Sequence, residues 1–398
     1  MFELFPMFVS GLFSFALCLV LMHVAMYIAP RIGLMDVPSE RKRHLAATPL
    51  VGGVAIFLSL CISNVFLEQI SWSFLGWMGL VLVIGVLDDL FDVSYRIRLV
   101  THAVIVGGIF LTDGLLVNNI GTLFWGNPVD FFGFIAIVFT AIGVIGAINA
   151  VNMVDGVDGL LASLMFASLL ALLLFGLQGS GVGVAFSVDS IAMLIGAIAA
   201  FGILNCRFFN LSRARVFMGD AGSTMLGFVL VYVLIAFSQG SAPTISPVLA
   251  GWILGLPLLD ASAVIAIRLI EKKAPFHPDR MHLHHLLMDA GYSVNQTVLY
   301  LLLIHASIIV FSSAMYMSFG NSIEPFLFWG FVFLVLLRVV CGLIYTRVLK
   351  SSQGKKTTQV PALEVTNRGS IAVELGLPEA TGKSAGGVSV VDVERSSD

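Results

Sequence analysis

Runs of about 20 apolar residues recur along this chain from the N-terminus to about residue 349, and a helix of roughly that length crosses the hydrocarbon core of a bilayer. Because hydrocarbon offers the backbone no hydrogen-bond partners, such runs must be helical. Charged residues make up 11% of the chain, whereas a soluble domain carries roughly 25%. The sequence therefore predicts an all-α polytopic membrane protein.

The apolar runs predict about eleven transmembrane helices of bilayer-spanning length. They are placed at residues 7–29, 49–67, 73–88, 99–116, 131–150, 159–178, 187–206, 222–238, 247–268, 297–318 and 323–346. Lys and Arg gather in alternate loops and after the last span, and such residues are held on the cytoplasmic side of a membrane. The N-terminus is therefore expected outside and the C-terminus in the cytoplasm.

The composition changes near residue 350. Residues 1–349 are expected to form one transmembrane domain with its active site at the cytoplasmic face. Residues 350–398 are rich in Ser, Thr, Gly and charge, which predicts a disordered cytoplasmic tail. The four cysteines form no CxxC pair and are interpreted as packing residues.

Polar residues gather in five stretches, all on the predicted cytoplasmic side. These stretches lie at residues 36–53, 88–98, 149–159, 210–224 and 272–285. In the first, the basic cluster around Arg43 and His44 is suited to anionic lipid head groups or to the phosphate of a lipid substrate. The clustering at one face predicts a functional site there.

Two adjacent acids, Asp88 and Asp89, end the third predicted span. They face the negative end of the helix dipole and repel each other, so a cation or polar partner is expected nearby. Arg96 and Arg98 follow in what we expect to be a loop, and they are candidates to pair with the acids or to contact a phosphate. Ordinary solvated acids would fit this stretch equally well.

Polar side chains recur at every third position where the fifth predicted span ends, at Asn149, Asn152, Asp155 and Asp158. On a helix this spacing would give a slowly drifting polar stripe. Their oxygens suit a hard cation such as Mg²⁺, and they also suit ribose or base donors. Helix capping would account for one or two of them but not for the whole run.

Two further stretches complete the set. Asn210 and Asp220 precede the eighth predicted span, where small residues and hydroxyls favour a phosphate site and an acid would hold its metal. A flexible glycine hinge is the competing interpretation. The ninth loop carries Arg280, His282, His284 and His285. These side chains can neutralise a pyrophosphate or donate a proton, with a zinc site as the alternative.

Two charged residues lie inside predicted spans. Asp260 is in the ninth span with Arg268 nearby; an acid inside a membrane is a functional candidate, although a structural ion pair is equally compatible. Arg338 is near the cytoplasmic end of the last span, where a long side chain can snorkel to the surface.

Together these stretches resemble the polyprenyl-phosphate N-acetylhexosamine-1-phosphate transferases (glycosyltransferase family 4), and within them the bacterial undecaprenyl-phosphate GlcNAc-1-phosphate transferases. The resemblance rests on five ordered motifs between residues 30 and 290. They are Asp36-Val-Pro with Arg-Lys-Arg-His44 and Pro-Leu-Val-Gly-Gly53, Leu-Asp88-Asp89 with Arg98, Asn149-Ala-Val-Asn152-Met-Val-Asp155-Gly-Val-Asp158-Gly-Leu, Phe-Met-Gly-Asp220-Ala-Gly-Ser, and Asp-Arg280-Met-His282-Leu-His284-His285.

The resemblance implies a reaction and a location. A HexNAc-1-phosphate, by default GlcNAc-1-phosphate, would pass from a UDP-sugar to undecaprenyl phosphate with release of UMP, and would start O-antigen or another cell-envelope polysaccharide. Mg²⁺, or Mn²⁺ in its place, is the expected cofactor. The expected setting is the bacterial inner membrane, with a multi-pass chain and a cytoplasmic active site.

The resemblance also implies residue roles. Asp220 and Asn152 would hold the metal, Asp88 would activate or position the lipid phosphate with Asp89 beside it, and Arg98 would serve the phosphates. Asp155 and Asp158 would lie along the nucleotide, with Asp158 near uracil. The remaining expected substrate-binding residues are Arg43, His44, Asn149, Asn210, Arg280, His282, His284 and His285. Arg98 replaces a frequent lysine, and Ser39 replaces a frequent asparagine.

Several alternatives stay open at this level. Other UDP-N-acetylhexosamines (GalNAc, QuiNAc, FucNAc) are compatible donors, and UDP-MurNAc-pentapeptide ranks lower because its branch carries a different histidine run. A transporter would place polar groups on both faces, and here they lie on one. No nucleic-acid partner is expected. The oligomeric state, a homodimer included, and the choice between one-step and two-step transfer are left open.

Overall fold

The computed structural model describes residues 4–37, 47–178, 186–209, 211–275 and 279–357. Three predicted site residues, Arg43, His44 and Asn210, lie outside this range, as does the predicted tail from residue 358 onward. The chain divides into two units, Met1–Arg347 and Val348–Asp398. The described part of the second unit is the end of the last helix, which continues to Thr357.

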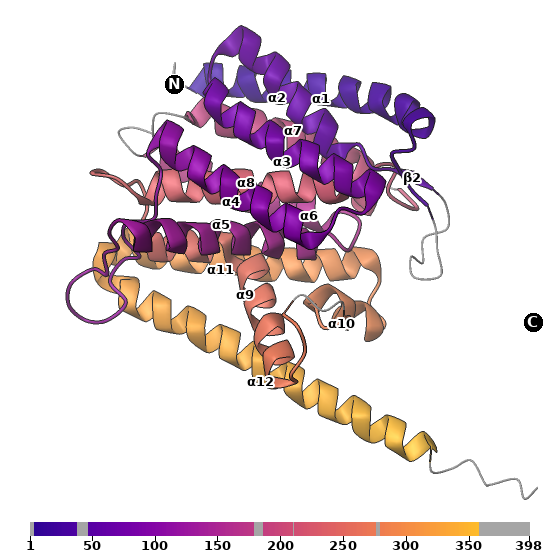
Figure 1. The fold of residues 1–398 in the computed structure, drawn as a ribbon, viewed down its shortest axis with the longest axis vertical. Helices are drawn as coiled ribbons and strands as arrows, with labels where there is room; N and C mark the ends of the chain where they lie inside the picture. Colours follow the sequence, from indigo (N-terminus) through magenta and orange to yellow (C-terminus); the bar gives the residue numbers. More distant parts are fainter. Residues whose placement is uncertain (1–3, 38–46, 179–185, 210, 276–278, 358–398) are drawn as a thin grey trace, which may run out of the picture. The chain divides into compact units, whose positions relative to one another are not determined.

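The described part of the first unit is almost entirely helical (Figure 1). Its long helices are α1 (Leu4–Ile32), α2 (Gly52–Leu67), α3 (Trp72–Phe91), α4 (Tyr95–Asp113), α5 (Phe134–Val154), α6 (Leu160–Gly176), α7 (Val188–Asn205), α8 (Gly219–Ser238), α9 (Pro247–Ile270), α11 (Val294–Phe319) and α12 (Glu324–Thr357). The short elements are α10 (Leu283–Asp289), the 3-10 turns η1 (Arg207–Phe209) and η2 (Gly320–Ile323), and the strands β1 (Met35–Asp36) and β2 (Thr48–Pro49).

Each predicted span coincides with one of the long helices, so the chain is a helical, polytopic membrane protein. Eight described segments are long and apolar enough to cross a membrane, and one of them runs from α11 into α12. Helices α2 and α6 are apolar but shorter. The ninth predicted loop, which carries His282, His284 and His285 and is called the histidine loop below, leads into the short helix α10.

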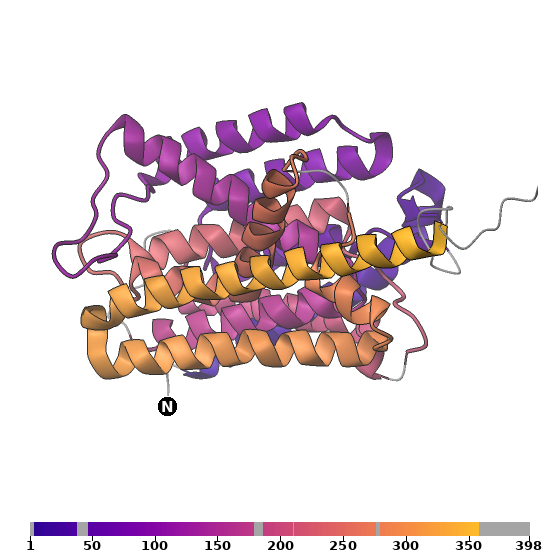
Figure 2. The ribbon, with the colours of Figure 1, turned by 90° about the horizontal axis from the view of Figure 1, so that it is seen from below.

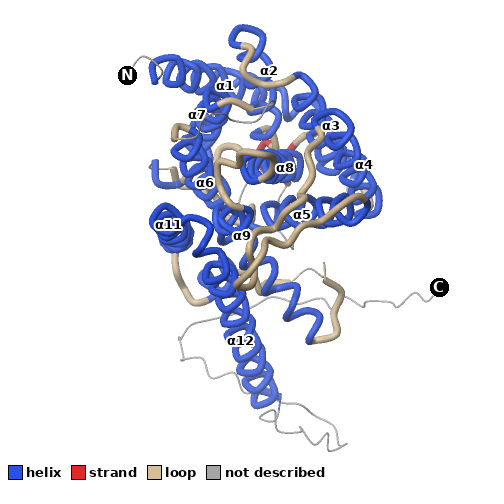
Figure 3. Tube along the Cα trace, turned by 90° about the vertical axis from the view of Figure 1, so that its left-hand side faces the viewer, coloured by secondary structure: helices blue, strands red, loops and turns tan. Residues whose placement is uncertain are grey.

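Helix α8 lies at the centre of the first unit, enclosed by the other helices (Figure 3). Almost all of its residues are buried. Small residues let the neighbouring backbones come close. A Cβ added to Gly53 of α2 would lie 2.2 Å from the Gly222 Cα, and one added to Gly85 of α3 would lie 2.3 Å from the Ala221 Cα. These contacts bring α2 and α3 against the first turn of α8.

Helix α9 bends in its middle. Gly255 has a φ of 50° and Pro257 follows it, and proline interrupts the helical hydrogen-bond ladder. The Nδ1 atom of His305 accepts the Leu256 N–H at 3.2 Å, which satisfies a donor freed by the bend. His305 is therefore a buried, hydrogen-bonded packing residue. After the bend, α9 runs across the direction of its neighbours (Figure 1).

Helices α11 and α12 diverge from the turn η2 that joins them, and α10 lies between them (Figure 2). The last turns of α9, the helix α10 and α12 therefore meet in one region. This arrangement positions the histidine loop.

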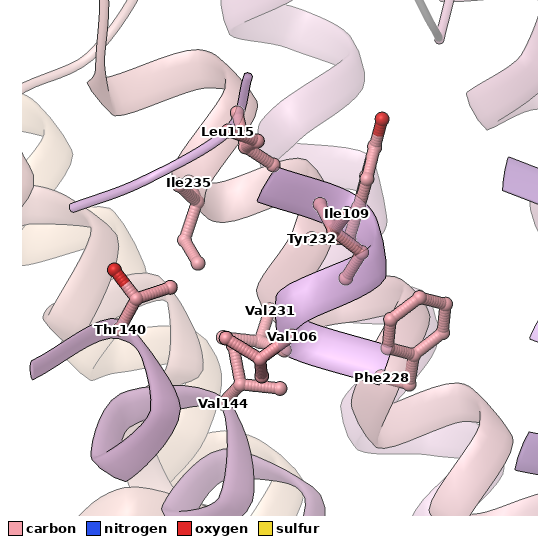
Figure 4. Close-up of a pocket in the computed structure, with 9 residues that line it drawn as sticks. All are labelled: Val106, Ile109, Leu115, Thr140, Val144, Phe228, Val231, Tyr232 and Ile235. Carbon is pink, nitrogen blue, oxygen red and sulfur yellow. The ribbon is translucent and has the colours of Figure 1, made fainter. Parts of the chain in front are cut away.

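A small cavity of about 10 Å³ lies between α4, α5 and α8, with Thr140 and Tyr232 as its polar lining residues (Figure 4). Both hydroxyls are already hydrogen-bonded: Thr140 donates to the Ala136 carbonyl at 2.7 Å and Tyr232 donates to the Asp113 carboxylate at 2.9 Å. Such a cavity holds about one water molecule. It is a packing gap and is too small for a substrate.

Candidate active site

The first turn of α8 is capped by a side chain from another helix. Asp89 of α3 accepts the Asp220 N–H at 2.9 Å and the Ala221 N–H at 3.2 Å. A carboxylate is stabilised at this position because the helix N-terminus carries partial positive charge. Gly219 has a φ of 73°, and a Cβ there would lie 2.6 Å from the Asp89 carboxylate. The second acid of the predicted pair is thus bound to the protein's own backbone.

The first acid of the pair binds an arginine. Arg98 donates from Nη1 to Asp88 Oδ2 at 2.5 Å, and the same Nη1 lies 3.7 Å from Asp220 Oδ2. The expectation of a loop around Arg98 was wrong, because α4 already begins at Tyr95, directly after Ser94. Arg96 instead lies over the Tyr95 ring. Of the two arginines, only Arg98 reaches the acids among the described residues.

The two predicted metal ligands lie side by side. Asn152 of α5 donates from Nδ2 to Asp220 Oδ1 at 3.1 Å and to Ser223 Oγ at 2.7 Å. The side chain of Asp220 is 49% exposed, so one face of this carboxylate is open. Asn149, one helical turn earlier, donates to the Ile145 carbonyl of its own helix at 2.7 Å. It does not join the group.

The prediction of a continuous helical stripe was wrong. Helix α5 ends at Val154, so Asp155 and Asp158 lie in a turn before α6. Burial, together with the charges of Asp220, Asp89 and Asp158, raises the pKa of the Asp155 carboxyl to about 8. None of the described residues donates a hydrogen bond to this carboxyl. Asp155 is therefore a crowded acid without a protein donor in the described part of the chain.

Asp158, in contrast, is bound within the protein. It accepts from Arg207 Nε at 2.7 Å and from the Ala214 N–H at 3.1 Å. Asn205 adds a second link, because it accepts the Gly159 N–H at 2.7 Å and donates to the Val216 carbonyl at 2.8 Å. Together these bonds hold the segment that leads into α8. Asn205 was not predicted, and only its place at the end of an apolar run marked it.

The histidines approach the same turn. A Cβ added to Gly156 would lie 2.5 Å from His284 Nε2, so the histidine ring sits directly over this glycine. The His284 ring is parallel to that of His282 at 5.9 Å and lies 4.2 Å from that of His285. Burial, together with the neighbouring His285 and His282, lowers the pKa of His284 to about 3. The His284 ring is therefore neutral near pH 7.

The basic and acidic residues around α10 are paired with one another. Arg280 donates from Nη2 to Asp289 Oδ1 at 2.6 Å, and this hydrogen bond raises the pKa of Arg280. Arg268 makes two bonds to the Asp279 carboxylate, at 2.9 and 3.0 Å. The expected proximity of Asp260 to Arg268 does not produce a pair. Asp260 instead contacts His282 and Arg338.

Arg338 does not snorkel as expected. It is 8% exposed and pairs with Asp260, because α12 packs against α9 at this depth. Within the described residues, no group of three or more His, Cys, Asp or Glu side chains is arranged to hold a metal ion. The acids and histidines nevertheless form one assembly, linked through α8, the turn after α5 and the helix α10.

Comparison with known proteins identifies the family. Residues 71–238 match the model of glycosyl transferase family 4, a range that includes the acids of α3, the turn after α5 and the first turn of α8. Proteins named undecaprenyl-phosphate alpha-N-acetylglucosaminyl 1-phosphate transferase are similar over most of their length. The one from Salmonella typhi is 37% identical over 283 residues, which are 70% of this chain and 75% of that protein.

Two further relatives with the same name extend the match. The protein from Yersinia pestis is 35% identical over 299 residues, covering 74% of this chain and 80% of its own. The protein from Pasteurella multocida is 35% identical over 329 residues, covering 78% of this chain and 86% of its own. This chain therefore belongs to glycosyl transferase family 4.

Proposed function

We propose that this protein transfers GlcNAc-1-phosphate from UDP-GlcNAc to undecaprenyl phosphate and releases UMP. The names of its relatives support this reaction. The observation that carries it in the structure is the assembly at the first turn of α8, where Asp220, Asn152 and Arg98 lie within hydrogen-bond or ion-pair distance. Acids, an amide and a guanidinium at one point suit a metal-bound pyrophosphate and a lipid phosphate.

Asp220 and Asn152 fit a magnesium ion. Mg²⁺ is usually bound through one or two carboxylates together with water and substrate phosphates, rather than by a protein cage. The half-exposed Asp220 carboxylate has an open face, and Asn152 uses its amide nitrogen on Asp220 and Ser223, which leaves its amide oxygen for a ligand. When bound, Mg²⁺, or Mn²⁺ in its place, would neutralise charge on the pyrophosphate.

The chain's own residues act mainly by positioning, as is general for phosphoryl transfer. An oxygen of the lipid phosphate forms a bond to the phosphorus that carries the sugar, and the bond from that phosphorus to the UMP oxygen breaks. Arg98, held by Asp88 at 2.5 Å, orients the incoming phosphate. Because that phosphate is already anionic, Asp88 is assigned to fixing Arg98 and not to removing a proton.

The nucleotide and the sugar are assigned to the side of Asp220 that lies away from Arg98, toward the turn after α5. Asp155 and Asp158 lie in the turn after α5, and His284 covers this turn at Gly156. Neutral His284 can donate a hydrogen bond to a phosphate or sugar oxygen. Arg280 is exposed and lies beside α10, where it would neutralise the pyrophosphate from outside.

We assign eleven transmembrane helices to the chain, with the N-terminus outside and the C-terminus in the cytoplasm. The segregation of Lys and Arg supports this orientation. In this orientation we assign the site to the cytoplasmic face of the bacterial inner membrane. The product would start O-antigen or another cell-envelope polysaccharide.

The test is transfer of radiolabel from UDP-[¹⁴C]GlcNAc to undecaprenyl phosphate by purified protein, in Mg²⁺, in Mn²⁺ and in EDTA. The expected result is a labelled lipid in either metal, release of UMP in equal amount and no product in EDTA. UDP-GalNAc, UDP-QuiNAc, UDP-FucNAc and UDP-MurNAc-pentapeptide, assayed in parallel, identify the sugar. Folded protein that forms no labelled lipid from any of these donors would contradict the proposal.

A further inference from the structure

A buried acid connects the histidine loop to the last helix. Asp260 is 3% exposed. Its Oδ2 atom lies 2.9 Å from His282 Nδ1 and accepts the Leu283 N–H at 3.2 Å, while its Oδ1 atom accepts from Arg338 Nε at 3.2 Å. Both oxygens of the carboxylate are therefore used, one toward α10 and one toward α12.

Arg338, like Asp260, is buried and hydrogen-bonded. Its side chain also donates to the Met281 carbonyl, in the residue before His282. A Cβ added to Gly342 would lie 2.4 Å from the Ile267 side chain and 3.0 Å from Arg338 Nη1, so α12 packs closely on α9 here. A buried charge is costly unless it is paired, and Asp260 and Arg338 pair with each other.

The contact at Nδ1 decides what His282 can present to a substrate. When one ring nitrogen of a histidine is hydrogen-bonded to a carboxylate, it carries the proton, and the second nitrogen is fixed as the functional one. The carboxylate also fixes the plane of the ring. That plane is parallel to the His284 ring, with an angle of 6° between them, and His284 covers the Asp155 turn at Gly156.

From this geometry we infer that Asp260 and Arg338 are positioning residues for the transfer reaction: Arg338 fixes Asp260, and Asp260 fixes the tautomer and orientation of His282. The inference rests on the proposed function for its effect on catalysis. Its structural part, the tautomer of His282, does not depend on which substrate is used. It also gives α12, outside the stretch matched by the family model, a role in the site that acts through Asp260 and His282.

A double-mutant cycle separates positioning from general stability. Arg338→Gln is expected to lower kcat on the order of 10- to 100-fold, the range typical for residues that orient a functional histidine, with a smaller change in the KM for UDP-GlcNAc. In His282→Gln, adding Arg338→Gln should cost nothing more, because residues that act through one another are not additive. Arg338→Lys, which keeps the charge, should restore part of the activity.

Glu324→Gln is the matched control. Glu324 lies on the same helix, is 2% exposed and accepts the Thr122 N–H at 2.6 Å. It is about 20 Å from Arg338 along the helix axis. Its effect, whatever its size, should multiply with that of His282→Gln. Elution from a size-exclusion column and the Tm in detergent verify that each variant is folded.

A second measurement needs no activity. In protein with ¹⁵N-labelled histidine, assigned with His282→Gln, NMR should show the wild-type His282 with a proton on Nδ1. Asp260→Asn should shift this population toward the Nε2–H form. An unchanged tautomer in Asp260→Asn, or multiplying losses from Arg338→Gln and His282→Gln, would overturn the inference. If the wild type is inactive with every donor but Asp260→Asn still shows the tautomer shift, the proposed function is overturned and the positioning of His282 stands.

Discussion

The two ends of α8 carry polar residues of similar kinds but arrange them differently. At the end of the helix, Gln239 accepts the N–H groups of Asn118 and Asn119 at 3.0 and 3.1 Å and donates to the Asn119 carbonyl at 2.9 Å. A polar hollow of about 480 Å³ opens there, and the amides around it bond one another. At the start of the helix, Asp155 and Asp220 crowd together, and Asp155 lacks a donor among the described residues.

This difference distinguishes scaffold from site. A polar group that is satisfied within the chain lowers the free energy of the folded state and has no need of a ligand. Crowded acids raise that free energy, and such groups persist where function requires them. The start of α8 is therefore assigned to the reaction, and the end of α8, around Gln239, to holding the loops that join the helices.

The largest expected effect is that of Asp220→Asn. Removing this charge should remove the metal's protein anchor, worth several kcal/mol in the transition state, and lower kcat/KM by about 10³-fold. Extra Mg²⁺ should not restore the rate. Asp130→Asn is the control. Asp130 is exposed and lies near Gln239 at the end of α8, and the variant should keep its activity. The measurement is labelled glycolipid formed per folded molecule, and equal losses in both variants would erase the distinction.

Gly156→Ala should have the next largest effect. The added methyl would lie 2.5 Å from His284 Nε2, so the ring must move, and displacements near 1 Å in an active site cost on the order of 10²-fold in rate. Gly146→Ala, on α5 with nothing within 4 Å of the new methyl, is the matched control and should be near wild type. A Gly156→Ala variant with the kcat of the wild type would show that the position of His284 does not matter for the reaction.

Gln239→Ala should affect stability and spare the chemistry. It leaves the N–H groups of Asn118, which is exposed, and Asn119, which is half-buried, without their acceptor, at a cost of about 0.5–1.5 kcal/mol for each lost hydrogen bond. The Tm in detergent should fall, and kcat per folded molecule should not. A variant with wild-type Tm and lower kcat would reverse the roles assigned to the two ends.

The smallest expected effect is a change in how stability depends on pH. The folded pKa of Asp155, about 8, lies above its ordinary value of 3.8, so the folded state binds more protons between these values and stability falls as pH rises through the window. In EDTA, Asp155→Asn should remove this fall, so the Tm of the variant should change less than that of the wild type as pH rises toward the alkaline side. Parallel curves of Tm against pH for the two proteins would show that Asp155 is already ionised.

Much of this arrangement can be predicted from the sequence, because it is local. Hydropathy alone places every long helix in the described residues, and the placement of the polar stretches on one predicted face of the membrane marks Asp155 and Asp220 as candidates for one site. The start of α4 was missed although Ser94 precedes it, a residue type that commonly begins a helix. A polar period of three suggested a continuing helix, but Gly156 and Gly159 allow the chain to turn.

The contacts between distant segments could not be predicted. Asp89 caps a helix that begins 130 residues later, and Arg338 meets an acid on α9. Each depends on how two helices pack, which is set by small residues such as Gly85 at their crossing point. Hydropathy carries no information on such pairing. The sequence therefore identifies the candidate site residues more readily than the contacts between helices that hold them in place.

Photolabelling of the wild-type protein by a 5-azido-uracil analogue of UDP-GlcNAc is the most direct test of which end of α8 binds substrate. Mass spectrometry of the digested protein locates the label, and excess unlabelled UDP-GlcNAc identifies specific attachment. Label in the turn around Asp155, in the segment leading to Asp220 or around His284 is the predicted result. Label around Asn119 or Gln239, at the end of α8, that excess unlabelled UDP-GlcNAc prevents would contradict the account.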